Sequence, residues 1–309
     1  MKIVFMGTPD FAVPCLEVCQ ENHEVLAVFT QPDRPKGRGK KMAAPPVKEK
    51  ALAYGLDVFQ PEKLKTPEMV ALLKELAPEC IVVVAYGQIL SKEILEIPAK
   101  GCINVHGSLL PKYRGASPIN WCIVQGEKET GITTMYMDVG LDTGDMIHKE
   151  SLLIGENMTF EELYLALRPM GAEVLGKTLE EIEVGKAPRT AQVDAESSYA
   201  PLLNKKNTMI DWTKSAEAVH NHIRGLKPIP VALTLYNGER IKVFASLVMD
   251  QTTNEAPGTI LKVSKFGLDV ATGQGVVRLT EIQFPNAKRL QVSQIILGRT
   301  IDTGTVLGV

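Results

Sequence analysis

The chain has 309 residues, of which 45% are hydrophobic and 23% charged, and its formal net charge is −2. This length allows two domains that each bury a core, and the composition is that of an ordinary globular protein. No apolar run reaches the roughly 18 residues of a membrane span, and the start MKIVFMGTPDF predicts a strand and turn rather than a signal peptide. The five cysteines lack a CxxC pair and lie mostly in apolar runs, so we expect buried thiols in a cytoplasmic protein.

The first half of the chain alternates short apolar runs with stretches of helical spacing. Strands are predicted over residues 2–6, 24–29, 80–85 and 101–105, and helices over 12–19 and 67–76. Such alternation predicts an α/β domain with a Rossmann-like, doubly wound and mostly parallel sheet. The segment GTPDF after the first run lacks the glycines of GxGxxG, which disfavours a dinucleotide site.

Two polar side chains, Asn104 and His106, stand two residues apart at the end of the fourth run. Strand geometry puts both on one face, near the carboxyl edge where open α/β sheets hold their ligands. An isolated pair of this kind is more often a polar strand end with a satisfied histidine. However, the loop VGLDTGD after a predicted strand over 132–137 carries Asp142 between two glycines, and its carboxylate could orient an imidazole.

Metal and covalent chemistry fit these residues poorly. His106 has no second His or Cys at ligand spacing, and His220 and His222 point apart on a predicted helix and are expected on the surface. Ser108 lies outside any GxSxG turn, so a serine nucleophile is unsupported. An amide and a charged imidazole can instead stabilise an oxygen that becomes negative when a carbonyl is attacked, while a carboxylate relays the proton. This combination indicates acyl transfer to nitrogen.

The last third of the chain follows different patterns. Residues 187–207 are polar and lack periodicity, as in a linker, and a helix is predicted over 215–224. The stretch VALTLYNGERIKVF predicts two strands around the turn Asn237-Gly238, and further short strands predict a small antiparallel, OB-like β-barrel. Residues 207–309 hold 11 Lys+Arg against 8 Asp+Glu, which points weakly to an anionic partner.

At this point two motifs resemble a known family. NVHGSLLPKYRGASPIN (104–120) and GLDTGDM (140–146) are similar to the 10-formyltetrahydrofolate-dependent formyltransferases. The segments KIVFMGTPDFAVPCLE (2–17) and TQPDRPKGRGKKMAAPPVK (30–48) resemble the members of that family that act on methionyl-tRNA. The likeness covers essentially the whole chain. It implies a formyltransferase catalytic domain over 1–189, a linker over 190–206 and a tRNA-binding β-barrel domain over 207–309.

The resemblance also implies roles for single residues. Asn104, His106 and Asp142 would form the catalytic trio, and formyl donor contacts are expected from Ser108, Leu109, Leu110, Pro111, Tyr86, Gly87 and Gly140. The 31–48 loop carries Arg34, Lys36, Arg38, Lys40 and Lys41 among Gly and Pro. Such a loop is most often merely solvated, but near a catalytic site it would suit RNA phosphates. Arg38, Lys40 and Lys41 are the expected tRNA contacts.

Taken together, we expect an enzyme that moves a formyl group from 10-formyltetrahydrofolate to the α-amine of methionine on initiator tRNA. It would be a cytoplasmic monomer that works without a metal. One alternative is a formyltransferase for a small amine, such as a nucleotide-linked amino sugar or a purine precursor. Another is a non-catalytic RNA-binding protein. The sequence departs from the family pattern at Lys227-Pro228-Ile229-Pro230 and at Asn120-Trp121.

Overall fold

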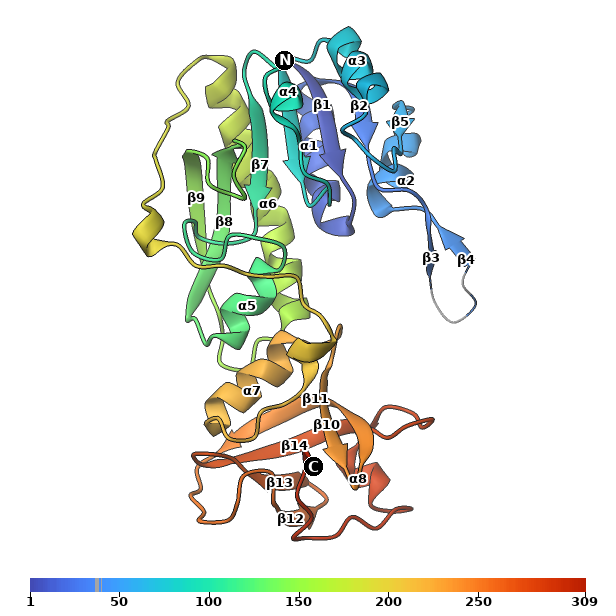
Figure 1. The fold of residues 1–309 in the computed structure, drawn as a ribbon, viewed down its shortest axis with the longest axis vertical. Coiled ribbons are helices and arrows are strands. Elements are labelled where there is room, and N and C mark those ends of the chain that lie inside the picture. Colours follow the sequence, from blue (N-terminus) through green and yellow to red (C-terminus); the bar gives the residue numbers. More distant parts are fainter. Residues whose placement is uncertain (37–38, 40) are drawn as a thin grey trace. The chain divides into compact units, whose positions relative to one another are not determined.

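The computed structural model describes residues 1–36, 39 and 41–309, which form two compact units (Figure 1). The first comprises Met1–Gly115, Thr130–Leu152 and Tyr164–Tyr199, and the second comprises Ala116–Glu129, Leu153–Leu163 and Ala200–Val309. The domain boundaries at 189/190 and 206/207 stay a prediction.

The first unit is built on a seven-stranded sheet with the order β5-β2-β1-β6-β7-β8-β9. The strands are β1 (Lys2–Gly7), β2 (Glu24–Phe29), β5 (Val58–Phe59), β6 (Cys80–Val84), β7 (Cys102–His106), β8 (Glu129–Tyr136) and β9 (Met146–Leu153). The pairs from β5 to β7 are parallel and the β7–β8 pair is antiparallel. The predicted Rossmann-like, mostly parallel sheet is confirmed.

Helices cover both faces of this sheet. On one face, α3 (Pro67–Leu76) and α4 (Lys92–Leu95) share a buried core with strands β1, β2 and β6. On the other, α6 (Phe160–Glu183) brings Gly171 against Val105 and Ile132 of β7 and β8, and Gly176 against Val18 of α1 (Val13–Asn22). The helix predicted over 67–76 has those bounds, because Thr66 caps the Met69 N–H and Pro67 follows at the first helical position.

The carboxyl ends of β1, β6 and β7 meet at one edge of the sheet. In the register, Gly7 lies opposite Val84 and Val83 opposite Asn104. His106 therefore stands at the edge, where strands give way to loops. A separate hairpin, β3 (Arg34–Lys36) with β4 (Lys41–Ala43), and helix α2 (Pro46–Ala53) follow β2.

The second unit carries an antiparallel sheet with the order β10-β11-β14-β13-β12, and β15 pairs with β14. The strands are β10 (Ala232–Tyr236), β11 (Glu239–Met249), β12 (Ile260–Ser264), β13 (Gly267–Ala271), β14 (Val276–Gln283) and β15 (Leu290–Gln291). Asn237 and Gly238 have φ of 50° and 77° between β10 and β11, which confirms the predicted hairpin. The pairing of the described strands is that of an open sheet, so closure into a barrel stays a prediction.

Helices α5 (Pro118–Val124) and α7 (Ala216–Gly225) pack together in this unit, and α8 (Val292–Ile295) packs on β13 and β14. Asn120 Nδ2 donates to the Gly225 carbonyl over 2.8 Å. A side chain at Gly225 would place its Cβ 2.8 Å from Val124 Cγ2, so the close helix contact depends on this glycine.

The expected surface position of the two helix histidines is wrong for His220, which is only 5% exposed. Its Nδ1 lies 2.9 Å from Ser246 Oγ, and His222 is half-buried with Nε2 3.4 Å from the Thr208 carbonyl. Burial lowers the pKa of both imidazoles, which favours their neutral form. Residue spacing shows that the two side chains point to different sides of the helix, but it does not show whether other parts of the chain pack against both sides.

Across the part of the chain that the structure describes, no helix combines the length and apolar character needed to span a membrane. The described residues likewise contain no group of three or more His, Cys, Asp or Glu side chains arranged to hold a metal ion. All five cysteines are buried thiols, as expected.

Candidate active site

Asn104 and His106 lie on the same face of β7 and are both largely buried, with 9% and 5% of their surfaces exposed. His106 is the last residue of β7, and the apolar neighbours at 103 and 105 point into the sheet's other face. Strand alternation thus presents an amide and an imidazole together at the sheet edge. The Asn-x-His spacing at the end of a predicted strand was enough to place both side chains on one face.

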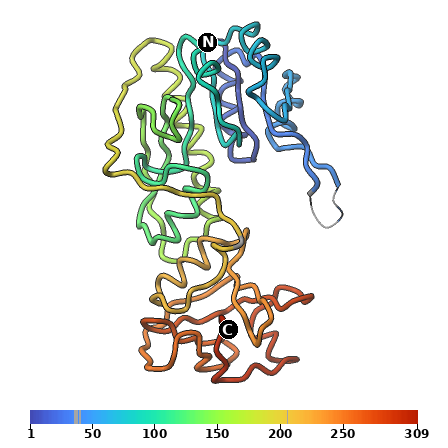
Figure 2. Tube along the Cα trace, in the orientation of Figure 1, coloured from blue at the N-terminus to red at the C-terminus, as the bar shows by residue number. Residues whose placement is uncertain are grey.

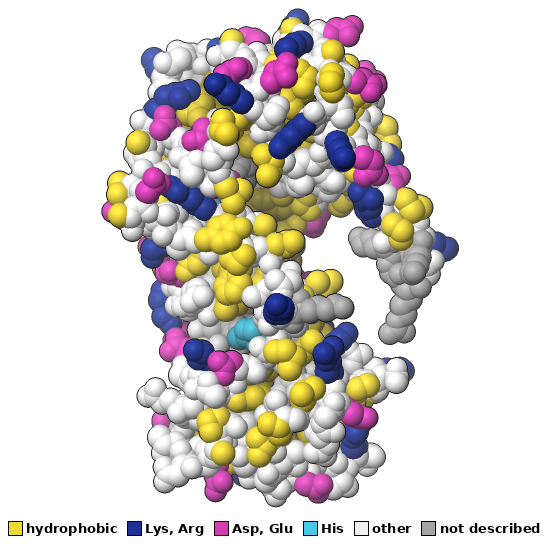
Figure 3. Space-filling view, viewed as in Figure 1, with side chains coloured by type: hydrophobic (Ala, Val, Ile, Leu, Met, Phe, Trp, Pro, Cys, Tyr) yellow, Lys and Arg dark blue, Asp and Glu magenta, His cyan; other side chains and the backbone are white. Residues whose placement is uncertain are grey.

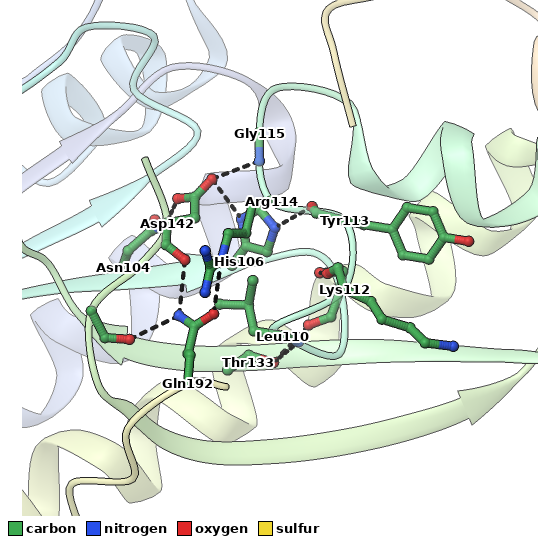
Figure 4. A network of polar contacts seen from close by, with 12 residues as sticks. Asn104, His106, Leu110, Lys112, Tyr113, Arg114, Gly115, Thr133, Asp142 and Gln192 are labelled. Carbon is green, nitrogen blue, oxygen red and sulfur yellow. Dashed lines mark hydrogen bonds and ion pairs between the residues drawn. The ribbon is translucent and has the colours of Figure 1, made fainter. Parts of the chain in front are cut away.

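Asp142 reaches this edge from the loop between β8 and β9 (Figure 4). Its Oδ1 accepts from Asn104 Nδ2 over 3.3 Å, and its Oδ2 lies 3.7 Å from His106 Nδ1. Oδ2 also accepts from the Gly115 N–H over 2.8 Å. Two residues on one strand and one that is 36 positions further on therefore converge, as predicted from the sequence.

The geometry of the Asp142 loop depends on its glycines. Asp142 itself has φ of 53°, in the left-handed region that costs energy for a residue with a Cβ. A Cβ on Gly140 would collide with Thr143 Oγ1, which donates to Asp138 Oδ1 over 2.6 Å. A Cβ on Gly144 would likewise collide with the Tyr136 carbonyl. The loop is thus a tight structure built to present one carboxylate.

The imidazole of His106 is held from two sides. Its Nε2 lies 2.9 Å from the Tyr113 carbonyl, which can only accept, so Nε2 carries a proton. Nδ1 then faces the Asp142 carboxylate, and a second proton placed there makes an imidazolium beside an anion. The site can therefore hold or release a proton at Nδ1, next to the amide of Asn104.

Thr133 of β8 holds the loop after β7 through two hydrogen bonds of its hydroxyl group. Thr133 Oγ1 donates to the Ser108 carbonyl over 2.6 Å and accepts from the Leu110 N–H over 3.1 Å. Ser108 Oγ donates to the Lys112 carbonyl over 2.7 Å, and Lys149 Nζ donates to the Leu110 carbonyl over 2.7 Å. Four residues of this loop were predicted to contact the formyl donor. Of these, Ser108, Leu110 and Pro111 are buried and Leu109 is half-buried.

Tyr86 and Gly87, which were also predicted to contact the formyl donor, follow β6 at the same sheet edge. The Tyr86 side chain is 2% exposed and belongs to the core cluster beneath α3 and α4, and burial raises the pKa of its phenol. Its carbonyl accepts from Thr8 Oγ1 over 2.9 Å and from Gln31 Nε2 over 3.2 Å. Gly87 has φ of 88°, a turn conformation open to glycine. Contact of either residue with a formyl donor stays a prediction, and for Tyr86 it would have to come from the backbone.

One of the three predicted tRNA contacts, Lys41, lies on the β3–β4 hairpin. Arg38 and Lys40 lie outside the described residues, while Lys41 is exposed at the start of β4. Asp33 anchors the base of the hairpin by accepting from Lys48 Nζ over 2.9 Å and from Gln60 Nε2 over 2.8 Å. Elsewhere, Lys and Arg side chains on the visible face are interspersed with Asp and Glu (Figure 3).

Three contributors to the site were missed in the sequence. The Tyr113 carbonyl and the Gly115 N–H act through the backbone, and Gln192 donates to the backbone of the Asp142 loop. Backbone groups carry no residue-type signal, and Gln192 lies in a polar stretch without periodicity. Their contribution depends on the folded conformation of the loops and could not be predicted from the sequence.

Comparison with known proteins bears on this geometry. A family model described as formyl transferase matches residues 1–179, and one described as formyl transferase, C-terminal domain, matches residues 202–300. The methionyl-tRNA formyltransferase of Clostridioides difficile (strain 630) is 55% identical over 309 residues, covering 100% of both chains. That of Acetivibrio thermocellus is 54% identical over 310 residues, again covering 100% of both.

Solved structures show the same fold at lower identity. The sugar 3N-formyl transferase WlaRD, crystallised with dTDP and 5-N-formyl-THF, has a TM-score of 0.69 at 20% identity and covers 93% of this chain and 99% of its own. HypX from Aquifex aeolicus in complex with tetrahydrofolic acid has a TM-score of 0.62 at 18% identity, over 98% of this chain and 50% of its own.

Proposed function

The chain belongs to the formyl transferase family, and from this we propose that it transfers the formyl group of 10-formyltetrahydrofolate to the α-amine of methionine on initiator tRNA. Relatives that match it from end to end at 55% and 54% identity are methionyl-tRNA formyltransferases. The product is formylmethionyl-tRNA for translation initiation. As part of the same proposal, the enzyme acts in the cytoplasm as a monomer.

The observation that carries the proposal is the position of Asp142, whose two carboxylate oxygens face Asn104 Nδ2 and His106 Nδ1. In the reaction, the amine nitrogen bonds to the formyl carbon, whose oxygen becomes negative. Asn104 carries two N–H groups on Nδ2, and we assign to this oxygen the one that does not face Asp142. A protonated His106 adds a positive charge near this oxygen, because its two N–H groups already face the Tyr113 carbonyl and Asp142.

Proton transfer falls to the same residues. The attacking amine must lose a proton, and the folate nitrogen must gain one when its bond to the formyl carbon breaks. Asp142 stabilises the imidazolium of His106 and can pass on the proton of the amine. The Gly115 N–H keeps Oδ2 in place, so little reorganisation is needed during the reaction.

The formyl donor would be bound by other parts of the first unit, and the tRNA by the basic residues of the 31–48 loop and by the C-terminal domain, residues 207–309. Backbone groups and Leu109 of the loop held by Thr133 would face the folate, as would Gly140 and the turn at Tyr86-Gly87. Lys41, with Arg38 and Lys40, would neutralise phosphates near the tRNA end without reading bases. The hydrogen bonds of Asp33 with Lys48 and Gln60 support this role, because they fix the position of the base of the hairpin that carries Lys41.

The test is product analysis. The purified protein is incubated with 10-formyltetrahydrofolate and methionylated initiator tRNA, methionylated elongator tRNA, or an amino sugar nucleotide. Formylmethionine released from initiator tRNA, with slower formation from elongator tRNA, supports the proposal. Preferential formylation of the amino sugar would favour the small-amine alternative, and no folate-dependent product with any acceptor would contradict both.

A further inference from the structure

One segment of the chain holds both groups that contact the His106 imidazole. Residues 190–199, here the 190–199 segment, follow α6 and are yellow to gold in Figures 1 and 2. At one end, Thr190 and Met146 exchange two backbone hydrogen bonds of 2.9 Å at the end of the Asp142 loop. At the other, Ser198 Oγ accepts from the Tyr113 N–H over 2.9 Å, and its carbonyl accepts from the Arg114 N–H over 2.9 Å.

Gln192 lies between Thr190 and Ser198 in the chain, and both its amide nitrogen and its amide oxygen form hydrogen bonds (Figure 4). Its Nε2 donates to the Asp142 carbonyl and to the Gly144 carbonyl, each over 2.8 Å. Its Oε1 accepts from Arg114 Nε over 3.0 Å. Arg114 directly follows Tyr113, whose carbonyl holds His106 Nε2. A single side chain thus ties the Asp142 loop to the loop that orients the imidazole.

The chemistry of this position suits glutamine in particular. Two carbonyls on one side need a donor with two N–H groups, and the guanidinium on the other side needs an acceptor. A glutamate could accept from Arg114 but could not donate to the carbonyls, and a lysine or arginine could donate but not accept. The bond to Arg114 also fixes which end of the Gln192 amide faces the loop.

The loop needs such support because Asp142 adopts a left-handed backbone conformation, with φ of 53°. Without the two carbonyl bonds, the backbone at 142–144 can relax and carry the carboxylate away from Asn104 and His106. A misplacement of about 1 Å in a catalytic group can slow a reaction on the order of 100-fold.

We propose that Gln192 is a positioning residue for formyl transfer, which holds the Asp142 carboxylate against Asn104 and His106 and is itself oriented by Arg114. The inference rests on the proposed function, since formyl transfer is its readout. It gives one side chain of the stretch after α6 a role in catalysis, where the sequence indicated only a linker.

The first experiment measures kcat and KM for formylation by Gln192→Glu and Gln192→Leu. Both should lower kcat by about 10- to 100-fold while KM for the methionylated tRNA changes less than about threefold. The matched control is Glu196→Ala in the same segment, which removes an exposed carboxylate and should keep kcat within about twofold. A kcat near wild type in Gln192→Glu would overturn the proposal.

The second experiment separates positioning from a general loss of stability. Gln192→Glu is combined with Asp142→Asn, and single-turnover rates are compared. If Gln192 acts through Asp142, adding its substitution to Asp142→Asn should cost less than about threefold, because the group that it positions is already lost. Multiplicative losses would overturn the inference. An inactive wild-type protein would instead contradict the proposed function, so the two failures are distinguishable.

Discussion

Replacing Asp142 with Asn keeps the shape of the side chain and removes its charge. In the structure, one carboxylate serves the Gly115 N–H, Asn104 Nδ2 and His106 Nδ1 at 2.8, 3.3 and 3.7 Å. An asparagine has one acceptor oxygen, so if it serves Gly115, its amide group meets another donor at Asn104. The variant therefore loses the ion pair with the imidazolium and disturbs the amide that faces the substrate.

The expected magnitude follows from the 3.7 Å separation of Asp142 Oδ2 and His106 Nδ1. Unit charges at this distance attract by about 4.5 kcal/mol at an effective dielectric constant of about 20. Since the Asp142 side chain is 14% exposed, solvent screens part of this attraction. We therefore expect the variant to lose about 2–4 kcal/mol of transition-state stabilisation. That corresponds to a rate about 30- to 1,000-fold lower.

The assay is single-turnover formylation of methionylated initiator tRNA by Asp142→Asn at saturating formyl donor. Asp145→Asn is the matched control, because that carboxylate lies in the same loop but pairs with Arg189 at 3.5 Å. We expect the control to stay within about threefold of wild type. A single-turnover rate for Asp142→Asn that equals the control would refute the assigned role of the carboxylate.

Three further outcomes are expected. Asn104→Ala should lower the single-turnover rate by about 100- to 1,000-fold, as for loss of one oxyanion donor, and a loss below about threefold would argue against that role. Gly140→Ala should lower kcat by about 10- to 100-fold, because the new Cβ collides with Thr143 Oγ1 and the loop must move; unchanged kinetics would show that the loop tolerates this shift. The pKa values of His220 and His222 are lowered by burial from 6.5, so the unfolded state binds more protons and stability should fall as pH drops below about 6.5. Thermal unfolding between pH 7.5 and 5 should show this loss, and His220→Gln should reduce it; an identical pH dependence in the variant would exclude His220 as a contributor.

Much of the fold follows from local patterns. The β-branched runs predicted β1, β2, β6 and β7 to within a residue or so at each end, since buried parallel strands need continuous apolar sequence. The turn at Asn237-Gly238 was predictable because both residues accept positive φ. The long helix α6 and the pairing α5–α7 were not, because they depend on which surfaces meet in the folded chain.

The residues of the site likewise include some that sequence patterns predict and some that they do not. Asn104 and His106 could be paired from the period of a strand, and Asp142 from its place between glycines. The partners that hold them are the Tyr113 carbonyl, the Gly115 N–H and Gln192, which depend on loop conformation and long-range contact. For the same reason, the burial of the Leu110 side chain was not foreseen when Leu110 was predicted to contact the formyl donor, whereas a place in the core was an open alternative for Tyr86.

The central claim is that Asn104, His106 and Asp142 act as one unit on the formyl carbon. The most direct test compares the single-turnover formylation rate of His106→Ala with that of a variant that replaces all three residues with Ala. Residues that act as a unit show strongly non-additive losses, so the triple variant should be only a few-fold slower than His106→Ala. Losses that multiply across the three positions, or a His106→Ala rate close to wild type, would contradict the account.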